Sequence, residues 1–337
     1  MPHGPDSGAR PLASVLFLAF NQERTVRGAV ASILAQAGPP IDIILSDDAS
    51  TDGTFEAMTE AVRGYAGPHQ IRLRRNTANV GIGEHLNQLV AESRGELLFI
   101  AAGDDESEPH RVETVVLAWQ AGGCRADLVA SHLTDMDTEG GLHGVLPVDD
   151  LARWRTAADW VVRRPYVVGA GHAWTRRVFD HFGPFEPGTA YEDQVMAFRA
   201  LASGGAFTVP EPLVRYRRGG VSARGQTPSA ESRLRRMAVQ NKRHLSEIRQ
   251  LMKDAARTDW APHVTAPLTR EWQKQAYVAH LMAADGPVAL VRTFLGPHKV
   301  PSGWRVRKFW AALRGRAWRL GSVKLPPGER GDNHRPT

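Results

Sequence analysis

The chain has 337 residues, 42% of them hydrophobic and 23% charged, a composition typical of a globular protein with one large core and an appendage. It contains no apolar run of about 18 residues and no basic-then-apolar leader, which excludes a transmembrane helix and a secretory signal and predicts a cytoplasmic protein. The single cysteine, Cys124, excludes a disulfide framework and a zinc site built mainly on thiolates.

The formal net charge of +6 is unevenly distributed. Arginine and lysine far outnumber acidic residues from Arg215 to Arg257 and again from Lys299 to Lys324. Such faces attract anionic partners, including phosphate-bearing substrates and acidic lipid surfaces. The basic runs contain no recognised nucleic-acid-reading module, so nucleic-acid binding is not expected.

The first hundred residues alternate apolar strands with helices. Short, continuous apolar runs predict strands buried on both faces of a parallel sheet, and apolar residues at helical spacing predict the helices between them. The expected class is therefore an α/β fold with a mostly parallel sheet. The predicted strands are 13–20, 41–45, 71–74 and 97–101, and the predicted helices are 22–37, 55–64 and 83–93.

The stretch LFIAAGDDE, residues 98–106, is the centre of this pattern. A buried strand runs directly into Gly103 and two adjacent carboxylates, Asp104 and Asp105. Ligands bind at the carboxyl edge of open α/β sheets, and paired carboxylates there suit a hard divalent cation that bridges to phosphate oxygens. A solvated turn after a core strand is the alternative interpretation of this stretch alone.

Polar residues also follow the other predicted strands. Asn21 follows the first, the segment SDDASTDGT the second, and Asn79 the third. We interpret Asp52 as a helix-capping residue, whereas Asp48 lies too far upstream to cap and could accept a ring N–H of a pyrimidine base. Because neither a Gly-x-Gly-x-x-Gly nor a Walker loop is present, a conventional dinucleotide or P-loop site is disfavoured.

An ordered set of segments resembles the family 2 glycosyltransferases, which have the GT-A fold and transfer sugars from nucleotide-sugar donors with inversion. The match extends from about Ala13 to Ser222. The segments that carry it are ASVLFLAFNQE, IDIILSDDASTDGT, NVGIGEHLN, RGELLFIAAGDD, GHAWTRRVFDHFGPFE and YEDQVMAFRAL.

The resemblance implies roles for individual residues. Asp193 would be the general base, Asp105 would ligate a divalent cation (Mn²⁺ or Mg²⁺), and Asp104 would lie near the ribose and diphosphate. The remaining donor contacts would come from Phe20, Asn21, Asp48 and Asn79. Contacts to the diphosphate or the acceptor are expected from His172, Glu192, Arg217 and Arg218, with Glu192 the neighbour that could be mistaken for the base.

The chain departs from the family pattern at two points. Ala102 occupies a position where the family often has a further aspartate, so metal ligation would rest on Asp105 with Asp104. The family often has a histidine two residues after its Tyr-Arg pair, whereas Tyr216-Arg217 is followed here by Arg218 and Gly219, so a basic side chain would have to compensate. We also expect a mobile lid through Gly219, Gly220 and Gly225, because glycines and phosphate-seeking arginines suit such a loop.

The C-terminal third is predicted to be a basic helical extension. Helices are expected over 229–256, 269–284 and 303–324, with 290–294 packing against the second. The last is basic, amphipathic and rich in tryptophan, which indicates either an interfacial helix on an anionic membrane or a helix docked on the catalytic domain or a partner. The expected divisions are a disordered tail (1–12), a catalytic domain (13–225, halves 13–106 and 107–225), the extension (226–325) and a second tail (326–337).

The sequence therefore predicts a metal-assisted, inverting glycosyltransferase. Its donor would be a UDP- or dTDP-sugar and its acceptor a glycan or glycolipid hydroxyl, at the inner face of the cytoplasmic membrane. Two alternatives remain: a protein that binds nucleotide-sugars without turnover, and a nucleotidyltransferase on a related fold, although Asn21-Gln22-Glu23 is not the basic, glycine-rich loop that a triphosphate needs. The sugar, the linkage and any homo-oligomeric state stay open.

Overall fold

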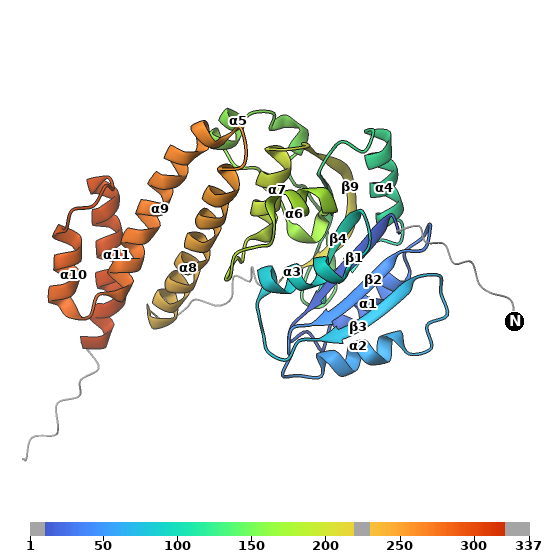
Figure 1. Ribbon diagram of the computed structural model, residues 1–337. Coiled ribbons are helices and arrows are strands. Elements are labelled where there is room, and N and C mark those ends of the chain that lie inside the picture. Colours follow the sequence, from blue (N-terminus) through green and yellow to red (C-terminus); the bar gives the residue numbers. More distant parts are fainter. Residues whose placement is uncertain (1–10, 219–229, 321–337) are drawn as a thin grey trace, which may run out of the picture. The chain divides into compact units, whose positions relative to one another are not determined.

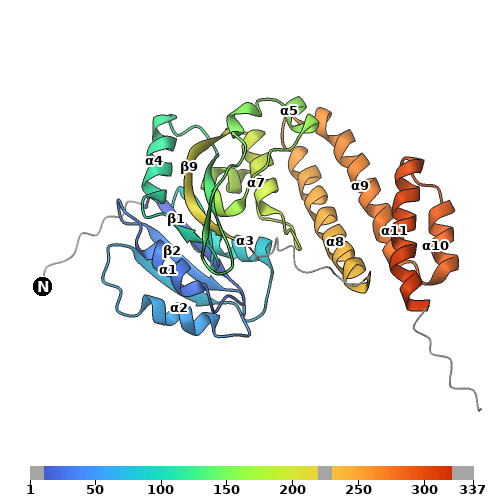
Figure 2. The same cartoon turned by 180° about the vertical axis from the view of Figure 1, so that it is seen from behind.

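The computed structural model describes residues 11–218 and 230–320 (Figures 1 and 2). These residues fall into two compact units, one containing 11–218 with 243–272 and the other 230–242 with 273–320. The expected lid at 219–225, the tail at 326–337 and most of the tail at 1–12 lie outside the described residues.

The first unit is built on a mixed sheet in the order β3-β2-β1-β4-β8-β6-β9-β5, with β7 paired to β6. The first four strands in this order are parallel, while β8, β5 and β7 run antiparallel to their neighbours. The strands are β1 (Ala13–Ala19), β2 (Asp42–Asp47), β3 (Gln70–Arg75), β4 (Leu97–Ala102), β5 (Glu106–Ser107), β6 (Leu128–Met136), β7 (Leu142–Leu146), β8 (Ala173–Thr175) and β9 (Ala206–Arg217).

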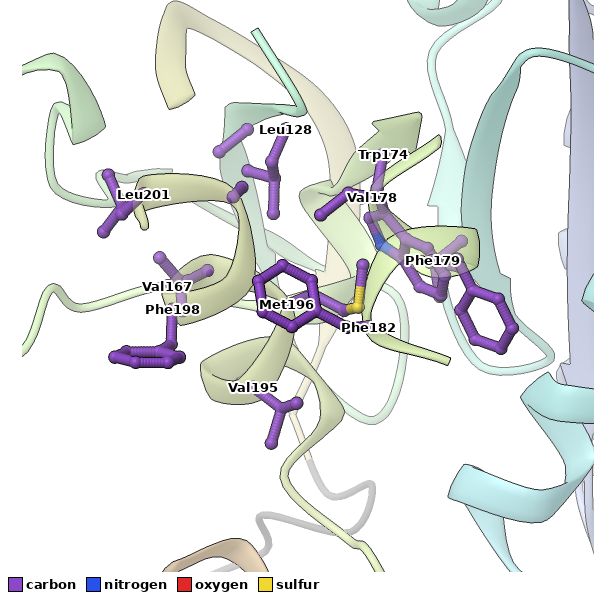
Figure 3. Close-up of a cluster of buried hydrophobic side chains, with 14 of the residues drawn as sticks. Leu128, Val167, Trp174, Val178, Phe179, Phe182, Val195, Met196, Phe198 and Leu201 are labelled. Carbon is purple, nitrogen blue, oxygen red and sulfur yellow. The ribbon is translucent and has the colours of Figure 1, made fainter. Parts of the chain in front are cut away.

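Helices cover both faces of this sheet. Alternate residues of β1 divide between two hydrophobic clusters, Val15 and Phe17 on one face and Leu16 on the other. The first face is covered by α1 (Val26–Leu34), α2 (Thr54–Val62) and α4 (Arg111–Ala121). The second is covered by α3 (Ile82–Glu92), α5 (Ala157–Val162), α6 (Arg176–Phe182) and α7 (Glu192–Leu201). Figure 3 shows side chains of α6 and α7 in this cluster, among them Met196, together with Trp174 of β8.

The predicted α/β class and the four N-terminal strands are confirmed, but the first helix was predicted to begin too early. It begins at Val26, not at residue 22. The backbone N–H groups of Asn21 and Gln22 donate to Ser50 Oγ (2.8 Å) and Thr54 Oγ1 (2.7 Å). Because the neighbouring loop binds these donors, residues 21–25 form a connection and the helix starts after it.

The second unit is helical, as predicted. Apart from the first part of α8 (Ala230–Ala255) and the last part of α9 (Ala261–Ala283), it consists of α10 (Gly286–Leu295) and α11 (Ser302–Leu320). Its core contains Tyr277, Leu281, Leu290, Val300 and Ala312. Residues 290–294, which were expected to pack against the helix predicted at 269–284, therefore lie in a separate helix, α10. Among the described residues, no helix combines the length and apolar character that crossing a membrane requires.

Within the first unit, a buried ion pair joins α8 to α7. Arg199 Nε lies 2.7 Å from Asp254 Oδ2, and both side chains are fully buried. Arg199 also donates to the carbonyl of Gly183, and Gln250 donates to Asp254, so the polar atoms of the pair are largely satisfied. Since α7 begins at the acidic residues Glu192 and Asp193, this contact fixes the helix that carries them.

Replacing Asp254 with alanine should destabilise the protein by about 3–5 kcal/mol, because it leaves the Arg199 charge buried and unpaired. The free energy of unfolding, measured with a chemical denaturant, checks this. The matched control is Glu60→Ala, which removes an exposed partner of Arg63 and should cost less than about 1 kcal/mol. Equal effects of the two substitutions would contradict the structural role of the buried pair.

Candidate active site

The strand order places a topological switch point between β1 and β4. From β1 the chain moves outward to β2 and β3, then returns to β4 on the other side of β1. Because these four strands are parallel, their carboxyl ends meet at one edge of the sheet, where open α/β sheets bind ligands. The segments after β1, β2, β3 and β4 at this edge carry the residues that the sequence predicted for the donor: Phe20, Asn21, Asp48, Asn79, Asp104 and Asp105.

The loops after β1 and β2 are joined by side-chain hydrogen bonds. Asn21 adopts the left-handed conformation (φ 53°), and its side-chain oxygen accepts from the backbone N–H of Thr51 at 2.9 Å. Asp52 Oδ1 accepts from the N–H of Thr54 at 3.1 Å, but the N-cap of α2 is Gly53, so the prediction that Asp52 is the capping residue was wrong. Phe20, directly after β1, is 44% exposed. An exposed aromatic ring at this edge is available to stack against a ligand.

Asp48 organises the segment after β3. Its carboxylate is 3% exposed and accepts from the Asn76 side chain (2.8 Å) and from the N–H groups of Val80 and Gly81 (3.0 Å each). The side chain of Asn79 donates to the backbone carbonyl of Asp48 at 3.3 Å. Three donors therefore hold a buried carboxylate in place at the position predicted to read the base. Each carboxylate oxygen can accept more than one hydrogen bond, so contact with a ring N–H remains compatible with this network.

Asp104 and Asp105 end β4 in an environment that disfavours their charges. Burial raises the pKa of both carboxyls, and for Asp105 burial together with the charge of Asp104 raises the pKa to about 8. Asp105 Oδ1 accepts from the backbone N–H of Arg217 at 2.8 Å. At Gly103 an added Cβ would come within 2.5 Å of Gln22 Oε1 and 3.2 Å of the Ala19 Cβ, so the backbone passes close to the loop after β1. Two buried acids that repel each other would be relieved by a cation.

Arg111, at the start of α4, is a residue that the sequence analysis missed. Its buried guanidinium donates to the carbonyls of Ile100 (2.9 Å) and Ala170 (2.7 Å) and to Ser107 Oγ (2.9 Å). Burial lowers the pKa of Arg111 to about 10, and the charge of Asp105 acts in the opposite direction. Its burial could have been predicted from helical spacing, because Arg111 precedes the buried Val115 and Trp119 at intervals of four residues and so lies on the same face of the helix.

Glu192 and Asp193 lie together at the first turn of α7. Asp193 accepts from the N–H of Gln194 (2.7 Å) and from that of Gly169. A Cβ at Gly169 would come within 2.8 Å of Glu192 Oε1, so the turn η2 (Gly169–Gly171) packs closely on the acidic pair. Burial raises the pKa of Asp193 to about 6, while burial and the charge of Asp193 raise that of Glu192 to about 8. Asp193 is thus the member of the pair that ionises first.

The same turn connects the two groups of acids. Gly169 contacts Asp193, and the carbonyl of the next residue, Ala170, accepts from Arg111. The other bonds of Arg111 reach β4 and the segment beside Asp105. A continuous set of contacts therefore runs from the end of β4 to the start of α7, which are separated by about ninety residues of sequence.

The other residues predicted to contact the diphosphate or the acceptor are His172, Arg217 and Arg218, and their surroundings differ. The His172 ring is buried, neither ring nitrogen has a hydrogen-bond partner among the described residues, and burial with the nearby Arg111 charge lowers its pKa to about 3. Arg217 donates to the carbonyls of Asp104 and Asp137. Arg218 is ion-paired with Asp135. His172 is therefore uncharged at neutral pH, and both arginines have protein partners in this structure.

Helix α8 brings residues close to the start of α7 that the sequence analysis also missed. Glu247 is 3% exposed, accepts from Arg164 at 2.9 Å, and its charge contributes to the raised pKa of Asp193. Glu247 and Asp254 are seven residues apart on the same face of α8 as Ile248 and Leu251. The position of these two carboxylates within an apolar stripe of the helix could have indicated from the sequence that they are buried.

Solved structures share this architecture. S. aureus TarS (residues 1–349), in complex with UDP-GlcNAc, aligns with a TM-score of 0.53 at 13% identity over 92% of each chain. The mannosyltransferase PcManGT from Pyrobaculum calidifontis, in complex with GDP-Man and Mn²⁺, aligns with a TM-score of 0.52 at 19% identity, over 94% of this chain and 90% of the other. The first unit therefore has a GT-A glycosyltransferase fold.

Sequence comparison identifies the family. Residues 14–156 match the family described as glycosyl transferase family 2, so the chain contains a family 2 glycosyltransferase domain. EpsE of Bacillus subtilis, named as a glycosyltransferase, is 35% identical over 106 residues, which span 32% of this chain and 37% of EpsE. The uncharacterized glycosyltransferase alr2836 of Nostoc is 24% identical over 78% of this chain and 84% of its own length. The succinoglycan biosynthesis protein ExoO of Rhizobium meliloti is 26% identical over 42% and 39%.

Proposed function

We propose that the protein transfers a sugar from a UDP- or dTDP-linked donor to a hydroxyl group of a glycan or glycolipid, with inversion at the transferred carbon. The observation that carries this proposal is the connection of two acidic centres by one turn. Asp104 and Asp105 lie at the switch point of a GT-A sheet, and Asp193 lies at the start of α7. Relatives named for polysaccharide biosynthesis support a glycan product.

The donor side fits a divalent cation, Mn²⁺ or Mg²⁺. Asp105, with the half-buried Asp104, offers adjacent carboxylates whose pKa values are raised mainly by burial, and that of Asp105 also by the charge of Asp104. Hard cations take oxygen ligands and commonly complete their shell with substrate phosphates and water. Such an ion would supply Lewis-acid stabilisation of the diphosphate leaving group. Phe20, Asn21, Asp48 and Asn79 would hold the nucleoside.

On the acceptor side, Asp193 would remove the proton of the attacking hydroxyl. A base near neutral pH should be ionised yet retain proton affinity, and a pKa raised to about 6 meets both conditions. The N–H groups of Gly169 and Gln194 hold the Asp193 carboxylate in place. Glu192 would fix the turn against which it packs and remain protonated at neutral pH, because its own pKa is raised further.

Two other functions fit these residues less well. A nucleotidyltransferase must hold a triphosphate, and the residues after β1 bind the neighbouring loop through Asn21 and Gln22 instead of forming a basic cradle. A protein that only binds nucleotide-sugars would need neither a buried carboxylate at Asp193 nor its raised pKa. Release of nucleoside diphosphate from UDP- and dTDP-sugars distinguishes a transferase from a binding protein.

Asp193→Asn should lower the release of nucleoside diphosphate by roughly 10²- to 10⁴-fold, the usual contribution of a positioned base, while leaving nucleotide binding intact. In the unsubstituted protein the rate should fall as the pH decreases through about 6, because protonation of Asp193 removes the base. Asp180→Asn, an exposed substitution on α6, is the matched control and should retain full activity. Unchanged turnover in Asp193→Asn would refute its role as the base.

We further propose that the second unit attaches the enzyme to an anionic membrane surface. Exposed Val288, Val291 and Leu295 recur along one face of α10, and Trp310 on α11 is 50% exposed. Residues 286–320 contain arginine and lysine but no acidic residue. Exposed apolar side chains surrounded by positive charge favour an interfacial position. Trp304 and Phe309, by contrast, pack against the core of the unit.

The double substitution Leu295→Ser with Trp310→Ala should weaken sedimentation with phosphatidylglycerol-containing vesicles by roughly tenfold or more, since two large apolar side chains are lost from the contact. Binding of the unsubstituted protein should also weaken at high salt. Leu117→Ala, which removes a similarly exposed side chain on α4, is the control and should bind normally. Equal binding to neutral phosphatidylcholine vesicles would contradict the proposed charge attraction.

A further inference from the structure

An aromatic pair lies beside the proposed base and has no role in the mechanism described above. The ring of Tyr191, the residue before Glu192, lies 5.1 Å from the ring of His244 on α8, with an angle of 30° between their planes. The Tyr191 side chain is partly buried and that of His244 is 42% exposed, so neither ring is enclosed in the core. Both residues belong to the first unit.

Some polar atoms of this pair remain available to form hydrogen bonds with a ligand. Nδ1 of His244 lies 3.3 Å from Glu247 Oε2, and Glu247 is itself fixed by Arg164. In the tautomer that donates from Nδ1 to Glu247, Nε2 is free to accept a hydrogen bond. The Tyr191 hydroxyl has no hydrogen-bond partner among the described residues. Burial raises its pKa, so at neutral pH it is a neutral phenol that can donate.

Rigid contacts hold this group in place. Arg164 donates to Glu247 (2.9 Å) and Glu271 (2.7 Å), which ties α8 and α9 to the segment after α5. The guanidinium of Arg164 also lies 4.8 Å from the ring of Trp160. Because Asp193 interacts electrostatically with both Tyr191 and Glu247, the aromatic pair and the base form one cluster.

We propose that Tyr191 and His244 form the acceptor subsite and that they select a saccharide acceptor. A pyranose has an apolar C–H face that packs on an aromatic ring, and hydroxyl groups at its edge that need nearby donors and acceptors. Tyr191 supplies the ring face and a donor, and His244 supplies a second ring and an acceptor. A sugar held there would present one hydroxyl to Asp193, two residues from Tyr191. This assignment rests on the proposed transferase function and specifies its acceptor.

The first test measures sugar binding without catalysis. Saturation-transfer NMR with methyl glycosides of glucose, galactose, mannose and N-acetylglucosamine should show contact with the unsubstituted protein for at least one sugar. Tyr191→Phe should keep most of this signal, whereas Tyr191→Leu, which retains apolar bulk without the aromatic face, should lose it. Absence of binding by all four glycosides, or equal binding by Tyr191→Leu, would overturn the proposal.

The second test uses transfer kinetics to the glycoside that binds. Tyr191→Leu and His244→Ala should each raise the KM for that acceptor by roughly fivefold, the size expected when an aromatic contact worth about 1 kcal/mol is lost. Tyr65→Ala is the matched control. Tyr65 also stacks on a histidine, His69 (6.3 Å), but it follows α2, at the amino end of β3, and should leave the acceptor KM unchanged.

The outcomes separate this proposal from the proposed function. If the unsubstituted protein releases no nucleoside diphosphate from any UDP- or dTDP-sugar, the transferase function fails. If it does so but the acceptor KM is unaffected by Tyr191→Leu, only the acceptor subsite fails. A merely structural role for Tyr191 would lower the melting temperature without changing the acceptor KM, and that result would also overturn the subsite.

Discussion

Two adjacent carboxylates, Asp104 and Asp105, end the central strand in a place where their charges are poorly hydrated and repel each other. Several neighbouring groups surround these two carboxylates. Arg111 lies buried near Asp105, the N–H of Arg217 donates to Asp105, and Gly103 lets the backbone pass close to Gln22. An arrangement that removes two adjacent carboxyl groups from water is costly for folding alone. It would be understandable if, as we propose, a cation at this site neutralises a diphosphate.

At the start of α7, a different set of contacts surrounds the acidic side chains of Glu192 and Asp193. Asp193 is held by backbone N–H groups, its neighbour Glu192 packs on the η2 turn, and Glu247 approaches from α8. The helix that carries Asp193 is in turn fixed by the buried pair of Arg199 and Asp254. Residues 243–255 of α8 therefore belong to the first unit and contact α7.

The periodicity of apolar residues predicted most of the donor half correctly, because its strands are buried on both faces and its helices have clear apolar stripes. The strand ends carrying Asn21, Asp48 and Asp104 followed directly from that pattern. The pattern failed where side chains override backbone preference, as at residues 21–25, whose N–H groups bind another loop. It also failed for Arg111 and Glu247, because a charged residue in a helix is usually solvated and only long-range contacts reveal its burial. These long-range partners cannot be inferred from one sequence.

The central claim is that the carboxyl edge of the sheet binds a nucleotide diphosphate through a cation on Asp105. The most direct measurement is the thermal stability of the protein with UDP, dTDP, GDP and CDP, each with and without Mn²⁺. The account predicts stabilisation by UDP or dTDP that requires Mn²⁺ and is lost in Asp105→Ala; a ligand at about 100 times its Kd would contribute about 2.7 kcal/mol. Stabilisation by none of the four nucleotides, or equal stabilisation of Asp105→Ala, would contradict it.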